Sequence, residues 1–133
     1  MKKEFGPFTI RISDINYGGH MGNDRALSLF QDARIFFLEE MGFSEKKIGE
    51  NIGIILTKAE VEYKREVFLH DELMATVTPG EIRSRSFELV YSFTRKCDGA
   101  EVFKGKTVLV AYDYYSSKTT QLPGQFLKEL GNE

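Results

Sequence analysis

The chain has 133 residues, of which 41% are hydrophobic and 29% charged, and its formal net charge is −2. This size fits one domain that buries about two thirds of its unfolded surface, so we expect a single domain over residues 1–133. The small net charge argues against nucleic acid or an anionic membrane as a partner. Two histidines and one cysteine exclude an internal disulfide and a Cys/His zinc cluster. We expect a soluble, cytoplasmic protein with no metal, cofactor or membrane span.

The first third of the chain predicts a strand, a glycine-containing loop and a long helix. Apolar and polar side chains alternate from Phe8 to Ser13, which is typical of a half-buried strand. From residue 23 to about residue 41, apolar side chains recur at spacings of three and four, which predicts a helix of about five turns that ends at Gly42. Three more apolar side chains widen its apolar face: Leu27, Ile35 and Leu38. We therefore expect this helix to be largely surrounded, as it would be inside a wrapped sheet.

The rest of the chain is mostly strand-like. Residues 44–51 predict a short polar helix or a turn. Four runs rich in β-branched and aromatic residues then predict strands: Ile52–Arg65, Glu72–Ile82, Ser86–Cys97 and Val102–Tyr115. Asp98-Gly99 is a strong hairpin signal, and Pro79-Gly80 predicts a bulge or bend within a strand. A terminal helix is expected within residues 121–130.

This order of elements predicts an α+β fold. We expect a curved antiparallel five-stranded sheet, arranged as a meander, that wraps around the long central helix. Such a sheet has two edge strands with unpaired backbone groups. A second copy of the chain would cover one edge by continuing the sheet, so we expect a homodimer.

The segment that is richest in chemistry joins the first strand to the helix. It reads Asp14-Ile15-Asn16-Tyr17-Gly18-Gly19-His20-Met21-Gly22-Asn23-Asp24. Glycines allow a backbone to approach a ligand closely, and the free amides at a helix start bind carbonyl oxygens or anions. The segment therefore predicts an oxyanion hole. The alternative is a glycine-rich turn in which Asn23 or Asp24 caps the helix.

The loop and the order of elements resemble the hotdog-fold acyl-CoA thioesterases, in particular the branch similar to 4-hydroxybenzoyl-CoA thioesterase. That branch has a loop of the form Asp-x-Asp-x-x-Gly-His-Val-Asn-Asn, which matches residues 14–23, and a Glu-Ala-Arg triplet, which matches Asp32-Ala33-Arg34. Weaker matches follow in the same order, at residues 61–73, Asp113 and Leu122-Pro123. The resemblance implies hydrolysis of an acyl-CoA by a homodimer, or by a homotetramer of such dimers, with the site at the dimer interface.

One position departs from this pattern. The second aspartate of the family loop attacks the thioester or activates water, and Asn16 stands there in this chain. An amide is neither a useful base nor a good nucleophile, although it can hydrogen-bond water or the substrate carbonyl. A non-catalytic protein that binds acyl thioesters is therefore an alternative. A hotdog dehydratase ranks lower, because the His-Phe-Pro stretch that we associate with that branch is missing.

Three residues are candidates for the chemistry. Asp24 is our first choice for the base, because a helix start favours an ionised carboxylate; the alternative is a structural first-turn carboxylate. His20 is a second possible base, or it orients Asn16 or Asp24, or it only ties the loop to the sheet. Asn16 would hydrogen-bond water or substrate. Asp14 is expected to anchor the loop through backbone amides.

Other residues are candidates for substrate binding. Gly18, Gly19 and Gly22 would present the backbone to the thioester carbonyl, with Asn23 as the helix cap. Tyr17 would line the acyl pocket or pack in the core. Basic side chains would bind the phosphates of coenzyme A, or be solvated surface: Lys58, Lys64, Arg65, Arg83 and Arg85. Neither the acyl group nor the choice between coenzyme A and acyl carrier protein follows from the sequence.

Overall fold

The computed structural model describes residues 1–131. Its helices and strands are, in chain order, β1 (Lys3–Thr9), α1 (Arg25–Glu40), β2 (Ile52–Tyr63), β3 (Glu72–Ile82), β4 (Ser86–Arg95), β5 (Glu101–Asp113), β6 (Lys118–Thr119) and α2 (Gly124–Leu130). A single 3₁₀ turn at Ile12–Asp14 precedes the glycine-containing loop. No helix in the described part of the chain is long and apolar enough to cross a membrane.

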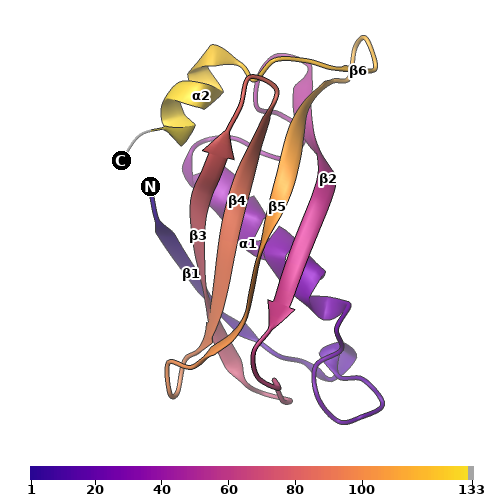
Figure 1. The fold of residues 1–133 in the computed structure, drawn as a ribbon, viewed down its shortest axis with the longest axis vertical. Helices are drawn as coiled ribbons and strands as arrows, with labels where there is room; N and C mark the ends of the chain where they lie inside the picture. Colours follow the sequence, from indigo (N-terminus) through magenta and orange to yellow (C-terminus); the bar gives the residue numbers. More distant parts are fainter. Residues whose placement is uncertain (132–133) are drawn as a thin grey trace.

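The strands form one antiparallel sheet in the order β1-β3-β4-β5-β2, with the short β6 paired to β5. Hairpins join β3 to β4 and β4 to β5, as expected. β2, however, lies at the far edge beside β5, so the expected simple meander is wrong. Residues 64–71 carry the chain from that edge across to β3, and α1 lies against one face of the sheet (Figure 1).

The core lies between α1 and this face of the sheet. The ring of Phe30 on α1 stacks on Tyr91 of β4 with ring centroids 4.4 Å apart, and both side chains are fully buried. At Gly105 of β5, a Cβ atom would lie 2.8 Å from the Phe30 ring, so only glycine allows this close approach of helix and sheet. The outer side of α1 stays open, since Leu27, Ile35 and Phe36 are 43%, 37% and 49% exposed. The sheet therefore covers one side of α1 and does not surround it.

Most local predictions agree with the structure. Gly42 ends α1 with a φ of +85°, Gly99 turns the β4–β5 hairpin with a φ of +73°, and the β3–β4 register shifts between Pro79 and Ile82. The terminal helix is present as α2. Residues 44–51 form turns with isolated bridges, which fits the turn and not the helix of that prediction.

The first strand lies earlier in the chain than the alternation from Phe8 to Ser13 predicts. β1 covers Lys3–Thr9, and the residues that follow leave the sheet. Ile10 exchanges backbone hydrogen bonds with the segment before β3, donating to the Asp71 carbonyl and accepting from the His70 amide, each at 2.9 Å. The Asp14 carboxylate accepts from the Arg11 amide at 2.8 Å and closes the 3₁₀ turn. The alternation of apolar and polar side chains therefore continues past Thr9, where β1 ends, and does not mark the end of the strand.

Candidate functional site

The loop before α1 is held together by hydrogen bonds from its own glycines. The amide of Gly18 donates to the Asn16 side-chain oxygen at 2.9 Å, and the amide of Gly19 donates to the Asn16 carbonyl at 3.1 Å. The amide of Gly22 donates to the Asp14 carbonyl at 3.0 Å. These three amides are therefore already used in this conformation. In this conformation the three glycine amides shape the loop and are not free donors, and their role in binding a thioester oxygen stays a prediction.

Asn16 is the residue around which this loop closes. Its side-chain oxygen holds Gly18 in an Asx-type turn, and its own amide donates to the His20 carbonyl at 2.9 Å. The side-chain nitrogen has no acceptor among residues 1–131. Asn16 thus keeps one free donor that could face water or a carbonyl oxygen, as the sequence suggested.

The start of α1 supplies the free backbone donors. The cap position is Asp24 and not Asn23, and no side chain bonds to the first amides of the helix. The amides of Asn23 and Asp24 themselves have no acceptor in the described chain. On the other side of this backbone, the Tyr63 hydroxyl at the end of β2 donates to the Asn23 carbonyl. The prediction that Asn23 caps the helix is wrong, and the uncapped amides are available to an oxyanion.

The Asp24 carboxylate lies beside these amides. A Cβ atom built on Gly22 would be 2.7 Å from Asp24 Oδ1, so the carboxylate rests against the glycine backbone. Burial raises the pKa of Tyr63, and the nearby negative charge of Asp24 raises it further. Free amides, a carboxylate and a tyrosine hydroxyl are therefore grouped around residues 22–24, at the positive end of α1.

His20 lines a small cavity on this side of the loop. Its Nδ1 donates to the Met21 carbonyl at 3.2 Å, which leaves Nε2 as an acceptor in the neutral ring. The cavity measures about 240 Å³ and is lined by His20, Met21, Asn23, Tyr63, Lys64, Arg65, Glu66, Val67 and Phe103. Ligand pockets usually enclose about 300 Å³ or more. This cavity therefore has room for a reacting group and not for a whole acyl thioester.

A second cavity, of about 500 Å³, has a different lining, which includes Asp14, Arg25 and Asp32. Asp14 fulfils its predicted anchoring role, since it accepts the Arg11 amide and also pairs with Arg25 Nε at 3.0 Å. Burial raises the pKa of Asp32; Arg25 opposes that shift and Asp14 adds to it. The two cavities thus hold different titratable side chains.

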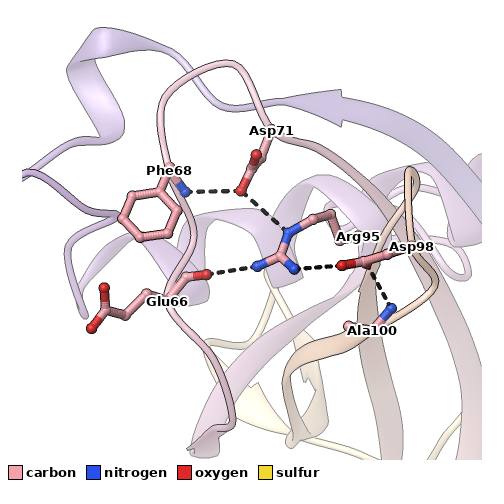
Figure 2. A network of polar contacts seen from close by, with 6 residues as sticks. All are labelled: Glu66, Phe68, Asp71, Arg95, Asp98 and Ala100. Carbon is pink, nitrogen blue, oxygen red and sulfur yellow. Dashed lines mark hydrogen bonds and ion pairs between the residues drawn. The ribbon is translucent and has the colours of Figure 1, made fainter.

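The segment between β2 and β3 forms a backbone hydrogen bond with the loop. The sequence did not predict this contact. The Met21 amide donates to the Val67 carbonyl at 2.7 Å. Figure 2 shows how Arg95 fastens this segment: its guanidinium donates to the Glu66 carbonyl at 2.9 Å, and it pairs with Asp98 at 2.9 Å and with Asp71 at 3.5 Å. The sequence signals for this network were the Asp98-Gly99 hairpin and the family-like stretch at residues 61–73, which contains Asp71.

The remaining predicted binding residues do not gather in one place, although Lys64 and Arg65 line the 240 Å³ cavity at His20. Tyr17 is fully exposed, so it does not pack in the core, and within one chain it lines no pocket described above. Lys58, Lys64 and Arg83 each pair with a neighbouring glutamate, at 3.2, 2.9 and 2.6 Å. Arg83 and Arg85 flank the β3–β4 turn, at the opposite end of the sheet from residues 64 and 65 (Figure 1). The five basic residues therefore form no single phosphate site.

Comparisons with known proteins give a consistent answer. A protein of Bacillus subtilis (strain 168), the uncharacterized protein YsmA, is 26% identical over 114 residues, which cover 86% of this chain and 76% of that protein. Among solved structures, Slr0204, a 1,4-dihydroxy-2-naphthoyl-CoA thioesterase from Synechocystis, is 15% identical with a TM-score of 0.84 over 97% of this chain and 93% of its own. SAV2348 from Staphylococcus aureus, solved in complex with CoA, is 16% identical with a TM-score of 0.84 over 97% and 80%.

The likeness to these structures establishes the fold, which is the hotdog arrangement that the sequence suggested. The family model for the thioesterase-like superfamily matches residues 10–130, which include the loop, α1, the strands from β2 onward and α2. The chain therefore belongs to the thioesterase-like superfamily.

Proposed function

We propose that this protein hydrolyses the thioester of an acyl-CoA to a free acid and coenzyme A. The observation that carries the proposal is the start of α1, where the free amides of Asn23 and Asp24 lie beside the Asp24 carboxylate. Membership of the thioesterase-like superfamily supports the reaction class. Coenzyme A bound to the structural relative from Staphylococcus aureus supports the kind of substrate.

In this proposal the thioester oxygen accepts hydrogen bonds from the amides of Asn23 and Asp24, with the helix dipole adding to the stabilisation. Asp24 takes a proton from a water molecule as that water attacks the carbonyl carbon. The tetrahedral intermediate then collapses, the C–S bond breaks, and the proton held by Asp24 passes to the departing thiolate. His20 Nε2 and the Asn16 side-chain nitrogen would position the water or the carbonyl oxygen. No cofactor takes part.

The site is completed in this proposal by a second copy of the chain. β2 is a terminal strand of the sheet, with twelve residues and one unpaired edge. The 240 Å³ cavity at His20 is too small for the substrate by itself. We therefore propose a homodimer, or a homotetramer of such dimers, in which Tyr17 reaches the neighbouring chain. Light scattering should give at least twice the chain mass of 15.2 kDa at micromolar concentration, and a monomeric mass would contradict this arrangement.

Cys97 is a free and exposed thiol, which suits a reducing compartment, so we place the reaction in the cytoplasm.

Thiol release from a panel of short, long and aryl acyl-CoAs tests the activity. Because Asn16 stands where the family has an aspartate, a binding protein is the second candidate. In that case the wild type would bind acyl-CoA without releasing thiol, and Asn16→Asp would create or greatly raise the activity.

A further inference from the structure

A second kind of cavity lies away from the glycine loop. It measures about 870 Å³ and is lined by Lys46, Lys47, Glu50, Asn51 and Tyr114. A second cavity of about 420 Å³ shares Lys46 and Tyr114 with it and continues along α1 past Gln31 to Ser28 and Leu27. We propose that these two cavities together bind the coenzyme A part of the substrate, with the phosphates at Lys46 and Lys47 and the adenine on Tyr114. This inference rests on the proposed function.

The charges of the larger cavity fit a phosphate group. Lys46 and Lys47 have no ion-pair partner within residues 1–131, unlike Lys58 and Lys64. The nearest acidic neighbour in sequence, Glu45, is already engaged, because it accepts from Arg34 at 2.8 Å and from Gln31 at 3.2 Å. Glu50 is the one carboxylate that lines the cavity in the described chain. Two lysines without ion-pair partners in the lining of one cavity are suited to bind a diphosphate.

The wall of this cavity is rigid. Tyr114 donates its amide to the Asn51 carbonyl at 2.8 Å, and its ring lies edge-on to Tyr112 at 5.0 Å. At Gly53, a Cβ atom would lie 2.7 Å from the Tyr114 ring and 2.9 Å from the Lys46 carbonyl. Because Gly53 has no side chain, both the Tyr114 ring and the Lys46 backbone can pack against it. The half-exposed Tyr114 ring is thus held in place before any ligand binds, which favours stacking of a flat base.

The smaller cavity extends from this wall along α1 to Leu27, one helical turn from Asp24. Asp24, Leu27, Ser28 and Gln31 lie on one face of α1, because they are spaced by three and four residues. The seven steps along the chain from Asp24 to Gln31 rise about 10 Å. The lining mixes apolar Ile54 and Leu56 with polar Thr107, Ser28 and Gln31. Such a lining suits the pantetheine arm, in which alkyl segments alternate with amides.

The test is the double variant Lys46→Ala/Lys47→Ala, assayed with one acyl group on two carriers. With the coenzyme A thioester, KM should rise about tenfold or more while kcat changes little, because the phosphates lose their partners. With the N-acetylcysteamine thioester, which has no nucleotide, the kinetic constants should match those of the wild type. The control is Lys2→Ala/Lys96→Ala, which removes the same charge at exposed lysines elsewhere and should leave both substrates unaffected.

A binding measurement separates this inference from the proposed function. Calorimetry with adenosine 3′,5′-bisphosphate needs no turnover; its affinity should fall at least fivefold in the lysine variant and in Tyr114→Ala, but not in Tyr114→Phe. If the wild type releases no thiol yet shows this pattern, the hydrolysis is wrong and the subsite stands. Unchanged KM and affinity in the lysine variant, or an equal loss on both carriers, would overturn the subsite. A preference for acyl carrier protein without nucleotide binding would overturn it as well.

Discussion

The two ends of β2 differ in how their polar groups are arranged. At the Tyr63 end, the loop, the start of α1 and the segment after β2 are joined by short hydrogen bonds around a cavity of only about 240 Å³. At the Ile52 end, a cavity of about 870 Å³ opens beside lysines without partners. Chemistry requires groups held in place, whereas binding a large ligand requires volume and free charge. In the proposed function these two requirements are met at separate places along α1 and β2.

The largest effect should come from removing the base at the Tyr63 end. Asp24→Asn keeps the size of the side chain but removes its basicity, so kcat should fall by about 10²- to 10⁴-fold. KM and the melting temperature should hardly change, because Asp24 makes no cap hydrogen bond. Thiol-release kinetics and thermal unfolding of the same sample measure the three quantities together.

The control for this variant is His20→Ala, which should cost less rate if the ring only positions other groups. Full rate in Asp24→Asn would show that the base is another group. His20 would be the next candidate, since its Nε2 is free in the neutral ring. A carboxylate from the neighbouring chain would follow.

The second effect concerns stability at the same end. Arg95 is only 17% exposed and joins Asp71, Asp98 and the Glu66 carbonyl (Figure 2). Arg95→Ala should lower the free energy of unfolding by about 2 to 3 kcal/mol, since it removes several charge-assisted bonds and leaves polar groups unpaired. Urea unfolding measures the loss.

Arg83→Ala is the matched control at the opposite end of the sheet. Its pair with Glu81 joins two exposed side chains, so the cost should stay below about 0.5 kcal/mol. Equal losses in the two variants would show that the Arg95 network is no more than a surface contact.

Local signals in the sequence predicted the fold well where the structure depends on local bonding. The stop at Gly42, the turn at Gly99 and the shift after Pro79 each depend on the residue at that position. The position of β2 beside β5 depends instead on hydrogen bonds between distant segments, as does the departure of Ile10 from β1. Periodicity reports which side chains are apolar, but it does not report which strand lies next to another.

The candidate site shows the same limit. The motif located residues 14–24, which do include the free donors and the carboxylate at the start of α1. It did not predict that the amides of Gly18, Gly19 and Gly22 bond within the loop, because that depends on the backbone angles. Lys46, Lys47 and Tyr114 carried no motif at all. They come together because Gly53 allows three segments to meet.

The third effect tests whether the loop holds the Asp24 carboxylate in position. In Gly22→Ala the new Cβ atom would lie 2.7 Å from Asp24 Oδ1, so the carboxylate must turn away. Because small displacements of a catalytic group are costly, kcat should fall about tenfold. Gly42→Ala is the control: it has a positive φ and no atom within 4 Å of its Cβ position, so it should lose about 1 kcal/mol of stability without losing rate. Equal rates in the two variants would contradict a positioning role for Gly22.

The smallest effect concerns two carboxylates, Asp32 and Asp98, whose pKa values are shifted in opposite directions. Burial raises the pKa of Asp32 above its ordinary value of 3.8, so the folded protein disfavours the charged carboxylate. This charge therefore lowers the free energy of unfolding at neutral pH. The penalty disappears as the pH falls through the pKa of Asp32 in the folded state and then through its pKa in the unfolded state, because the carboxyl group is then protonated in both states. Asp32→Asn should therefore stabilise the protein at pH 7 by about 0.5 kcal/mol or less, since solvent screens this partly exposed group, and the gain should vanish near pH 3.

Asp98→Asn, in the turn between β4 and β5, should change stability with the opposite sign. The Ala100 amide and Arg95 lower the pKa of Asp98, so its charge stabilises the folded protein above the unfolded pKa, and this contribution is lost as the pH falls through the folded pKa. Asp98→Asn should therefore destabilise at pH 7 and approach the wild type in acid. Urea unfolding of both variants at several pH values measures the two curves. A gain in Asp32→Asn that does not change with pH would show that altered packing, and not the buried charge, is its cause.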